Sequence, residues 1–323
     1  MTSAETRMHV IRDPLGAPVA ELPRGAIATI GNFDGVHRGH QRILRRVVER
    51  AREVGRPAVA ITFEPHPLAV LRPDQAPPRL QTLRQKEEAM EAIGLDTLLV
   101  IPFTRDFSLT EPEEFVGDFL GARLAASEIL LGRHFAFGRG KRGDLSLLAR
   151  LGPESGFEAS AVEEVEFEGE PISSTRIREA IRAGEVARAA QMLGRDYEMD
   201  GIVTKGEGMG RKIGYPTINL SPENELYPGN GVYVSRLAVP SSGTVLDAVT
   251  NVGTRPTLYE DVARTIETYV PDFSGDVYGE KVRLFFRERL REERKFASLE
   301  DLTAQIGRDV DDARAYFKAG AGD

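Results

Sequence analysis

Cysteine is missing from the 323-residue chain, and its absence excludes disulfide bonds, thiolate nucleophiles and cysteine-ligated zinc. The sequence also has no apolar run close to the ~18–20 residues that a bilayer-spanning helix needs. Its first residues, MTSAETRMHVIRD, do not have the basic and then apolar layout of a secretory signal. These absences predict a cytoplasmic protein with no membrane-spanning segment.

An excess of basic residues is absent as well. The chain has 42 Lys and Arg residues against 50 Asp and Glu residues, and its formal net charge is -8. The overall field of such a protein repels a polyanion, so we expect no nucleic-acid partner, although a local basic pocket for a nucleotide is compatible with this charge. Low-complexity tracts and fixed-period repeats are also lacking. The length favours two domains.

The first part of the chain alternates short apolar runs with segments of helical period. This alternation, with strands that are apolar on both faces, predicts a Rossmann-like α/β domain with a parallel sheet between helices. The expected strands are residues 26–31, 57–63, 96–103 and 127–132, and the expected helices are residues 41–54, 82–93 and 111–122.

After residue 200 the pattern changes to short strands separated by glycine and proline, which predicts a small antiparallel barrel or sandwich followed by a terminal helix. A helical stretch at residues 177–194, with Gly194 as its stop, precedes the change. We therefore expect a first domain of residues 1–198 and a second of residues 199–323. The expected strands are residues 200–206, 231–239, 244–253, 264–270 and 280–289, and the expected helix is residues 299–317.

The segment Gly31–His40 lies between an expected strand and an expected helix, where backbone N–H groups attract an anion. His37 and His40 are three residues apart, and Gly39 allows close approach of a ligand. Imidazoles in this place can donate hydrogen bonds to a reacting phosphoryl group. Chance proximity and metal binding are the alternatives that the spacing leaves open.

A second phosphate element is indicated by Ser173–Arg178, where three hydroxyl residues precede a helical pattern. An N-cap explains one hydroxyl, but Arg176 and Arg178 lie at the helix end where the dipole disfavours cations unless an anion is bound. Plain capping is the alternative. Aromatic side chains after two other strands, in Thr62–Pro67 and Gly132–Asp144, suit a pocket for a ring, or the ordinary core.

These blocks resemble a known family. Gly35–His40 resembles the H-x-G-H signature of nucleotidyltransferases, and Phe33–His37 narrows the resemblance to FAD synthetase, as do Thr62–Pro67 and Ser173–Arg178 in the same order. The resemblance implies that His37 and His40 stabilise the attacked α-phosphate and the triphosphate. It further implies that Asn32, Phe33, Asp34, Gly39, Ser174, Thr175 and Arg176 bind ATP, and that Phe63, Pro65, His66, Phe135 and Phe137 bind the flavin.

One departure from that family lies in the loop at Phe135. The family usually has Asp or Asn before a Phe-Arg-Phe-Gly sequence, whereas this chain has His134-Phe-Ala136-Phe-Gly. The change affects the role of this loop in binding FMN or Mg²⁺. It suggests an alternative in which the adenylyltransferase is weakened.

The second half contains a glycine-rich segment, Gly201–Leu220, whose amides, with Lys205 and Arg211, suit a pyrophosphate; a plain turn between strands is the alternative. Thr217 and Asn219 are two apart and so share one face of an extended strand, where their oxygens can ligate Mg²⁺. The competing explanation is that they are buried and satisfy strand ends.

Glu267 lies on an otherwise apolar expected strand. Its carboxylate can accept the proton of an alcohol that attacks a γ-phosphate. A cross-strand salt bridge is the commoner explanation for such a glutamate.

This half resembles riboflavin kinase, through Gly210–Asn219, Asn251–Thr257, Ile266–Thr268 with Asp272–Gly279, and Leu290–Phe296. The resemblance implies a six-stranded antiparallel barrel, Glu267 as the base, and Mg²⁺ on Thr217 and Asn219. Tyr269 replaces the more usual His, a change that we expect to be tolerated. The implied ATP-binding residues are Gly208, Gly210, Arg211, Gly214, Pro216, Thr217 and Asn219, and the implied flavin-binding residues are Asn251 and Arg291.

The two resemblances therefore imply a bifunctional enzyme of FAD biosynthesis with Mg²⁺ as cofactor and ATP as co-substrate. The second domain would make FMN from riboflavin, and the first would make FAD from FMN. Its partners would be these small molecules, and the sequence does not indicate an oligomeric state. A flavin-binding sensor built on the same two folds is an alternative from another class of protein, although the sequence has no DNA-binding helix pair.

Overall fold

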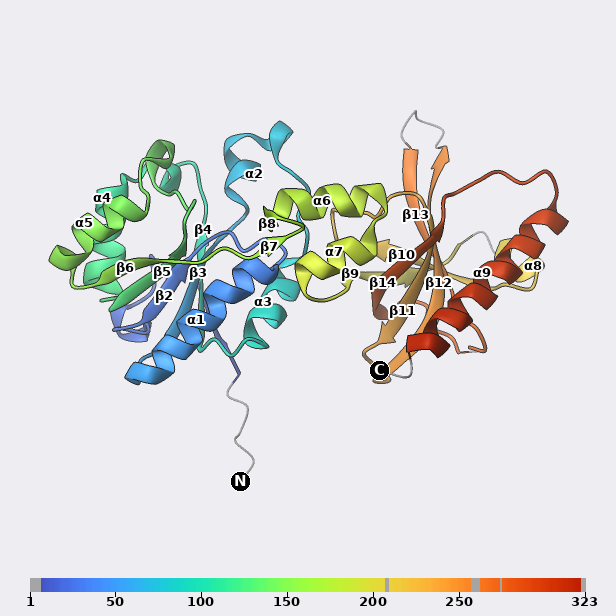
Figure 1. Cartoon of the computed structure of the whole chain (residues 1–323), viewed down its shortest axis with the longest axis horizontal. Helices are drawn as coiled ribbons and strands as arrows, with labels where there is room; N and C mark the ends of the chain where they lie inside the picture. The colour runs from blue at the N-terminus through green and yellow to red at the C-terminus, as the bar shows by residue number, and fades with distance from the viewer. Residues whose placement is uncertain (1–6, 207–208, 257–261, 274, 321–323) are drawn as a thin grey trace, which may run out of the picture. The chain divides into compact units, whose positions relative to one another are not determined.

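The computed structural model describes residues 7–206, 209–256, 262–273 and 275–320. The pattern of contacts divides the chain into two units, Met1–Pro78 with Leu83–Ser173, and Arg79–Thr82 with Ser174–Asp323. Figure 1 shows the elements of each unit. The expected boundary at residues 198/199 lies within a strand of the second unit, and the contacts place the helical stretch before it in the second unit.

The first unit is built on a parallel sheet whose described strands follow the order β1-β4-β3-β2-β5-β6. Neighbouring strands are paired in parallel throughout. The strands are β1 His9–Arg12, β2 Ile27–Ile30, β3 Ala58–Glu64, β4 Thr97–Pro102, β5 Glu128–Gly132 and β6 Glu158–Val162.

Each face of this sheet carries its own hydrophobic core, because alternate residues of a strand point to opposite faces. On one face Ala58 and Ala60 pack with residues of α1 and α3, and on the other Val59 and Ile61 pack with residues of η4 and α5. The helical elements are η1 Val19–Glu21, α1 Arg38–Val54, α2 Pro67–Leu71, η2 Pro73–Gln75, α3 Leu83–Glu91, η3 Phe107–Leu109, α4 Pro112–Glu114, η4 Phe115–Arg123, η5 Arg139–Lys141 and α5 Leu145–Ser155.

Two details of this unit differ from the sequence expectation. The helix expected at residues 111–122 is a short α-helix that continues as a π-helix, with a hydrogen bond from Leu124 N to Phe119 O. The pattern also missed β1, β6 and the small hairpin of β7 Glu166–Phe167 and β8 Glu170–Pro171. Three of the five side chains of β6 are exposed, so this edge strand has no apolar period to detect.

The second unit contains a closed antiparallel barrel with the strand order β10-β13-β12-β11-β14-β9. The expected six-stranded barrel with a terminal helix is confirmed. The elements are α6 Ser174–Ala183, α7 Val186–Leu193, β9 Tyr197–Thr204, α8 Met209–Lys212, β10 Thr217–Pro222, β11 Gly231–Val239, β12 Thr244–Pro256, β13 Val262–Tyr269, β14 Lys281–Arg291 and α9 Leu299–Gly320.

The helical stretch expected at residues 177–194 is interrupted at Gly184. This glycine has φ +81°, and a Cβ here would lie 2.8 Å from the hydroxyl of Tyr233. The left-handed conformation and the close approach both require glycine, so the stretch divides into α6 and α7. Gly194 ends α7 in a left-handed conformation, as expected.

The terminal helix α9 packs on the outside of the barrel. Val310 and Ala313 of α9 form a buried cluster with Val232, Val234 and Val249 of β11 and β12. Because α9 is held here by apolar contacts, the strands beneath it and the helix together can enclose a pocket.

Candidate active sites

The loop that follows β2 lies at the switch point of the parallel sheet. β2 is paired with β3 on one side and with β5 on the other. Strands β3 and β4 are added on one side of β2, and β5 and β6 are added on the other side, so the strand order reverses at β2. Ligands of open parallel sheets bind outside the carboxyl ends of strands at such a point. The loop Gly31–His37 therefore occupies the position where the fold favours a ligand.

His37 and His40 are brought together at the start of α1. Their rings are stacked with centroids 3.6 Å apart and planes 19° apart. His37 is the N-cap of α1, and its Nδ1 accepts a hydrogen bond from the backbone N–H of His40 at 3.3 Å. The neutral His37 ring must therefore carry its proton on Nε2.

His40 lies beside the buried Phe33, whose ring centroid is 5.3 Å away. Burial holds the pKa of His40 well below its ordinary value, and the neighbouring His37 and Lys86 lower that pKa further. Its Nδ1 is buried and makes no hydrogen bond within the described part of the chain. If the neutral ring carried its proton on Nδ1, that buried N–H would have no acceptor. The tautomer with its proton on Nε2 is therefore favoured.

The other predicted residues of this loop lie in one short segment. Asp34 is buried and Asn32 is exposed. Phe33 has φ +47° and Val36 has φ +38°, a left-handed conformation that is uncommon for residues other than glycine. A Cβ at Gly39 would lie 3.1 Å from the His37 ring, so a larger residue here would press on that histidine.

His66 lies after β3 and approaches the same loop. Its Nδ1 accepts the backbone N–H of Leu68 at 3.2 Å, so its Nε2 carries the proton in the neutral form. That Nε2 is 3.5 Å from the Asn32 side-chain amide. The pair is complementary when the oxygen of the amide faces the ring. The exposed Pro65 precedes His66.

The phenylalanines of the two predicted flavin loops join one aromatic cluster. Phe63 is 6.0 Å from Phe107, Phe107 is 6.1 Å from Phe115, and Phe115 is 5.9 Å from Phe137. Phe63 and Phe137 are 8% and 7% exposed and belong to the core. Phe135 stacks on Phe137 at 5.8 Å and remains half-buried, so it offers more free ring surface than either of them.

His134, which stands where the family usually has Asp or Asn, is exposed beside this cluster. Its Nε2 is 3.3 Å from Oε1 of Glu164. Position 134 therefore still lies close to a carboxylate, which a different residue provides.

Ser174, Thr175 and Arg176 form the first turn of α6. Arg176 lies in that turn as the sequence predicts, whereas two of the hydroxyl residues expected before the helix lie inside it. The contacts assign them to the second unit, whereas His37 and His40 belong to the first. Thr175 is exposed, and Ser174 and Arg176 are half-buried.

Three predicted residues of the barrel lie in one row across neighbouring strands. Asn219 on β10 is directly opposite Glu267 on β13, and Glu267 is directly opposite Asn251 on β12. Opposite residues of antiparallel strands have Cβ atoms about 4.5–5.5 Å apart, so the three polar side chains are neighbours on one face. The row places the candidate base beside two amides.

A cavity of about 360 Å³ opens where this row meets α9. Its walls include five of the predicted kinase residues, together with Tyr269 and residues of α9. The predicted residues that line it are Gly210, Thr217, Asn251, Glu267 and Arg291.

Arg291 is tied to Asp309 on α9. Its Nε and Nη2 donate to the carboxylate oxygens at distances from 2.7 to 3.1 Å, and its Nη1 donates to the carbonyl of Glu292 at 3.0 Å. Asp309 is 3% exposed and also accepts from Gln305 at 2.8 Å. Arg291 therefore fastens α9 over the cavity.

The glycine-rich segment borders two neighbouring cavities. Asn219 lines one of about 420 Å³ with Lys205, and Arg211 lines one of about 90 Å³ with Pro216 and Thr217. Gly214 has φ +86° and forms the turn after α8, while Gly208 and Thr257 lie outside the described residues.

Comparison with known proteins identifies both halves. The family model for FAD synthetase matches residues 19–176, and the model for riboflavin kinase matches residues 193–317. A bifunctional riboflavin kinase/FMN adenylyltransferase of Escherichia coli (strain K12) is 36% identical over 293 residues, which are 91% of this chain and 93% of that protein. The bifunctional riboflavin kinase/FMN adenylyltransferase of Pseudomonas fluorescens is 39% identical over 90% of this chain and 93% of that protein.

The chain belongs to the bifunctional riboflavin kinase/FMN adenylyltransferase family. The family predicted from the motifs is confirmed, and with it the prediction of a two-part transferase. The crystal structure of a macrolide-efflux protein from Streptococcus pneumoniae is also similar, with a TM-score of 0.85, 28% identity, and coverage of 95% of this chain and 99% of that chain.

Two features of this family member concern metals and membranes. Within residues 7–206, 209–256, 262–273 and 275–320, no three His, Asp or Glu side chains gather as a metal-binding group. A magnesium ion held by few protein oxygens and by nucleotide phosphates is compatible with that finding. No helix in the same ranges is long and apolar enough to span a membrane.

Sequence reasoning missed some residues that the fold places at the two sites. Lys86 on α3 is buried beside the loop Gly31–His37, and Asp309 on α9 is buried against Arg291. Lys86 occurs in a segment rich in Gln, Lys and Glu, and Asp309 occurs in a polar helix. Neither position carries a local sequence signal, because the residues around it are the same kind that surround an ordinary surface lysine or aspartate.

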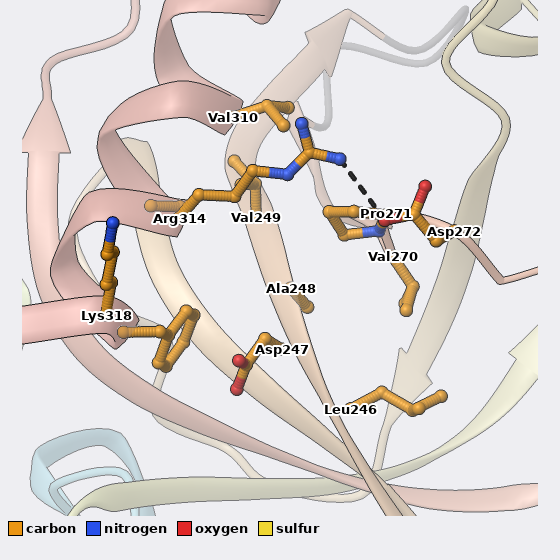
Figure 2. A pocket seen from close by; sticks show the side chains of 12 residues that line it. Leu246, Asp247, Ala248, Val249, Val270, Pro271, Asp272, Val310, Arg314 and Lys318 are labelled. Carbon is orange, nitrogen blue, oxygen red and sulfur yellow. Dashed lines mark hydrogen bonds and ion pairs between the residues drawn. The ribbon is translucent and has the colours of Figure 1, made fainter. Parts of the chain in front are cut away.

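A further cavity, of about 440 Å³, lies between β12, the residues after β13, and the end of α9. Figure 2 shows Arg314 of α9 paired across it with Asp272, at 3.2 Å. Its described lining includes none of the predicted site residues. The predicted kinase residues that line a described cavity all line one or more of the other three.

Proposed function

We propose that this chain forms FMN from riboflavin and ATP at the barrel, and FAD from FMN and a second ATP at the parallel sheet. The observation that carries the proposal is the row Asn219, Glu267 and Asn251, which lies within a riboflavin kinase match while the stacked His37 and His40 lie within an FAD synthetase match. Two separate groups of residues thus support two reactions.

At the barrel, the ribityl 5′ oxygen bonds to the γ-phosphorus of ATP while Glu267 accepts the proton of that hydroxyl. The bond from that phosphorus to the β-phosphate oxygen breaks, and ADP leaves. The nucleotide is held by Gly208, Gly210, Arg211, Gly214 and Pro216. The flavin site is lined by Asn251 and Arg291. Because Nε, Nη1 and Nη2 of Arg291 each donate to Asp309 or to the carbonyl of Glu292, we infer that Arg291 acts chiefly by shaping the pocket.

Thr217 and Asn219 fit a magnesium ion. Glycines leave room for both side chains, since a Cβ at Gly210 would lie 3.3 Å from the Thr217 hydroxyl and a Cβ at Gly206 would overlap the Asn219 amide. A hydroxyl and an amide oxygen beside Glu267 are the hard oxygen donors that Mg²⁺ prefers. The ion, when bound, neutralises charge on the ATP phosphates.

At the parallel sheet, a phosphate oxygen of FMN attacks the α-phosphorus of ATP, and pyrophosphate leaves. The neutral rings of His37 and His40 donate from Nε2 to the phosphate oxygens, where charge develops. Asn32, Phe33, Asp34 and Gly39 shape this loop. Ser174, Thr175 and Arg176 bind phosphate by resemblance to the FAD synthetase motif, and they lie within the FAD synthetase match. No covalent enzyme intermediate is needed, because positioning and charge neutralisation act on both substrates directly.

The flavin of this second reaction binds beside the half-buried Phe135. Phe137 supports that ring from the core. Phe63 on β3, with Pro65 and His66 just after it, completes the flavin-binding residues of the proposal. An offset aromatic contact with isoalloxazine suits a ring that is partly free.

The domain boundary at residues 198/199 and a cytoplasmic location belong to this proposal. The boundary separates the histidine loop from the whole glycine-rich segment, although β9 begins at Tyr197. The location agrees with the absence of cysteine.

A time course with the purified protein, riboflavin, ATP and Mg²⁺ tests the proposal, with FMN and FAD separated by chromatography. We expect FMN to appear first and FAD to follow, and chelation of Mg²⁺ to stop both until Mg²⁺ is added back. FMN that accumulates without FAD would favour a kinase with a weakened adenylyltransferase. Flavin binding without ADP release would favour a sensor.

A further inference from the structure

Lys86 of α3 is a buried lysine at the loop that carries the two histidines. The residue is 7% exposed, whereas lysine is rarely buried without a partner. Its Nζ donates to the backbone carbonyl of Asn32 at 2.9 Å, across 54 positions of sequence. The hydroxyl of Thr62 on β3 donates to the same carbonyl at 3.3 Å. A carbonyl oxygen has two lone pairs, so it accepts from both.

The carbonyl that Lys86 holds stands at the start of a strained loop. Phe33 and Val36 have φ of +47° and +38°, and Gly35 between them has φ +84°. Left-handed residues other than glycine persist where the surrounding structure fixes them, and they gather at functional sites. Here two other elements, α3 and β3, fix the first peptide of the segment that ends at His37.

We propose that Lys86 is a positioning residue for adenylyl transfer, in which its ammonium group fixes the Asn32 carbonyl and thereby the loop that presents His37 and His40 to the phosphates. The inference rests on the proposed adenylyltransferase function and adds a residue to it that the motifs do not include. Lys86 acts on the histidines through the loop and through its charge.

The charge of Lys86 also reaches His40. Burial has the largest effect on the pKa of His40, and the other groups that lower this pKa are His37 on the same loop and Lys86 on α3. A cation beside a histidine disfavours the imidazolium form. Lys86 therefore keeps the ring neutral, so that the buried Nδ1 carries no proton while Nε2 donates.

Two variants of Lys86 test the inference, with the intact kinase as an internal standard. Lys86→Met removes both the donor and the charge, and Lys86→Gln is a milder change for use where the first variant does not fold. Arg84→Met is the matched control, because Arg84 lies on the same helix but is half exposed and pairs with Glu88 at 3.1 Å. The measured quantities are the turnover of FMN to FAD over a range of pH, and the turnover of riboflavin to FMN.

We expect FAD formation to fall by about 10-fold to 100-fold in the Lys86 variants, because a small displacement of a catalytic group costs a factor of this order, with FMN formation within about two-fold of the parent. The acid limb of FAD formation should also move to higher pH, because the pKa of His40 rises when the cation is removed. Arg84→Met should change neither quantity.

Two results would overturn the inference. Unchanged FAD formation in the variant that folds would show that the loop does not need Lys86. A reduced rate with an unmoved acid limb would show a purely structural contribution to folding. Failure of the proposed function itself is distinguishable, since the parent protein would then form no FAD.

Discussion

Asn219 stands directly opposite Glu267 in the register of β10 and β13, and Asn251 stands opposite Glu267 on its other side. The closed barrel fixes this arrangement, because both neighbours of β13 are hydrogen-bonded to it. A shift of one residue in either pairing would turn the amide to the other face. The barrel therefore defines the surroundings of the candidate base through its backbone register.

Glu267→Gln removes the proton acceptor with little change in shape. We expect FMN formation to fall by about 10²- to 10⁴-fold, the usual contribution of a general base. FAD formation from supplied FMN should keep its rate. Separate assays with riboflavin and with FMN measure the two activities. Glu288→Gln, at an exposed position of β14, serves as the control, and unchanged FMN formation in Glu267→Gln would remove the assignment of the base.

His40→Ala should have the opposite pattern. Loss of one donor to a developing phosphate charge typically costs about 10²- to 10³-fold, so FAD formation should fall by this factor while FMN formation stays near the parent value. The exposed His9 on β1 offers a control variant, His9→Ala, which we expect to behave like the parent. Equal loss of both activities in His40→Ala would contradict two independent sites.

The pH dependence of FAD formation follows from the lowered pKa of His40. The ordinary pKa of histidine is about 6.5, so the folded ring remains neutral as the pH falls through that value. FAD formation at saturating substrate should therefore hold steady down to about pH 6.5 and decline only below it. Because the unfolded chain binds a proton at His40 more readily than the folded chain, the contribution of His40 to the free energy of unfolding is fully present above about pH 6.5. This contribution is lost as the pH falls from that value through the lowered pKa. A decline of the rate centred near the ordinary value would argue against neutral His40 as the donor.

Asp309→Asn should loosen α9 from the barrel. The change leaves Arg291 largely buried without its carboxylate, and breaking a buried ion pair from one side costs about 3 kcal/mol. We expect a lower free energy of unfolding in urea and a higher KM for riboflavin, with unchanged FAD formation from FMN. Asp312→Asn, on an exposed position of the same helix, is the control. An unchanged riboflavin KM would show that the ion pair does not shape the pocket.

Much of the fold could be predicted because its strands carry strong local patterns. The buried runs at Ala58–Glu64 and Thr97–Pro102 are apolar on both faces, as strands between two helical layers must be. The exposed edge strand Glu158–Val162 has no such pattern. Gly184, where the helical stretch is interrupted, lies close to the hydroxyl of Tyr233, a tertiary contact that no local pattern contains.

The sites divide in the same way. His37 and His40 could be found because their spacing and Gly39 are local features of one loop. Lys86 could not be found, because it reaches Asn32 across 54 positions and only burial distinguishes it from a surface lysine. The row of Asn219, Glu267 and Asn251 needed the register of three strands to become visible.

Mixing two variants, each of which has lost a different one of the two reactions, tests the central claim of two separate sites most directly. With riboflavin, ATP and Mg²⁺, Glu267→Gln alone should form neither FMN nor FAD at an appreciable rate, and His40→Ala alone should stop at FMN. Together they should form FAD, because FMN released by one variant is adenylylated by the other. No FAD from the mixture, although each variant keeps its remaining activity when assayed alone, would contradict two independent sites linked by free FMN.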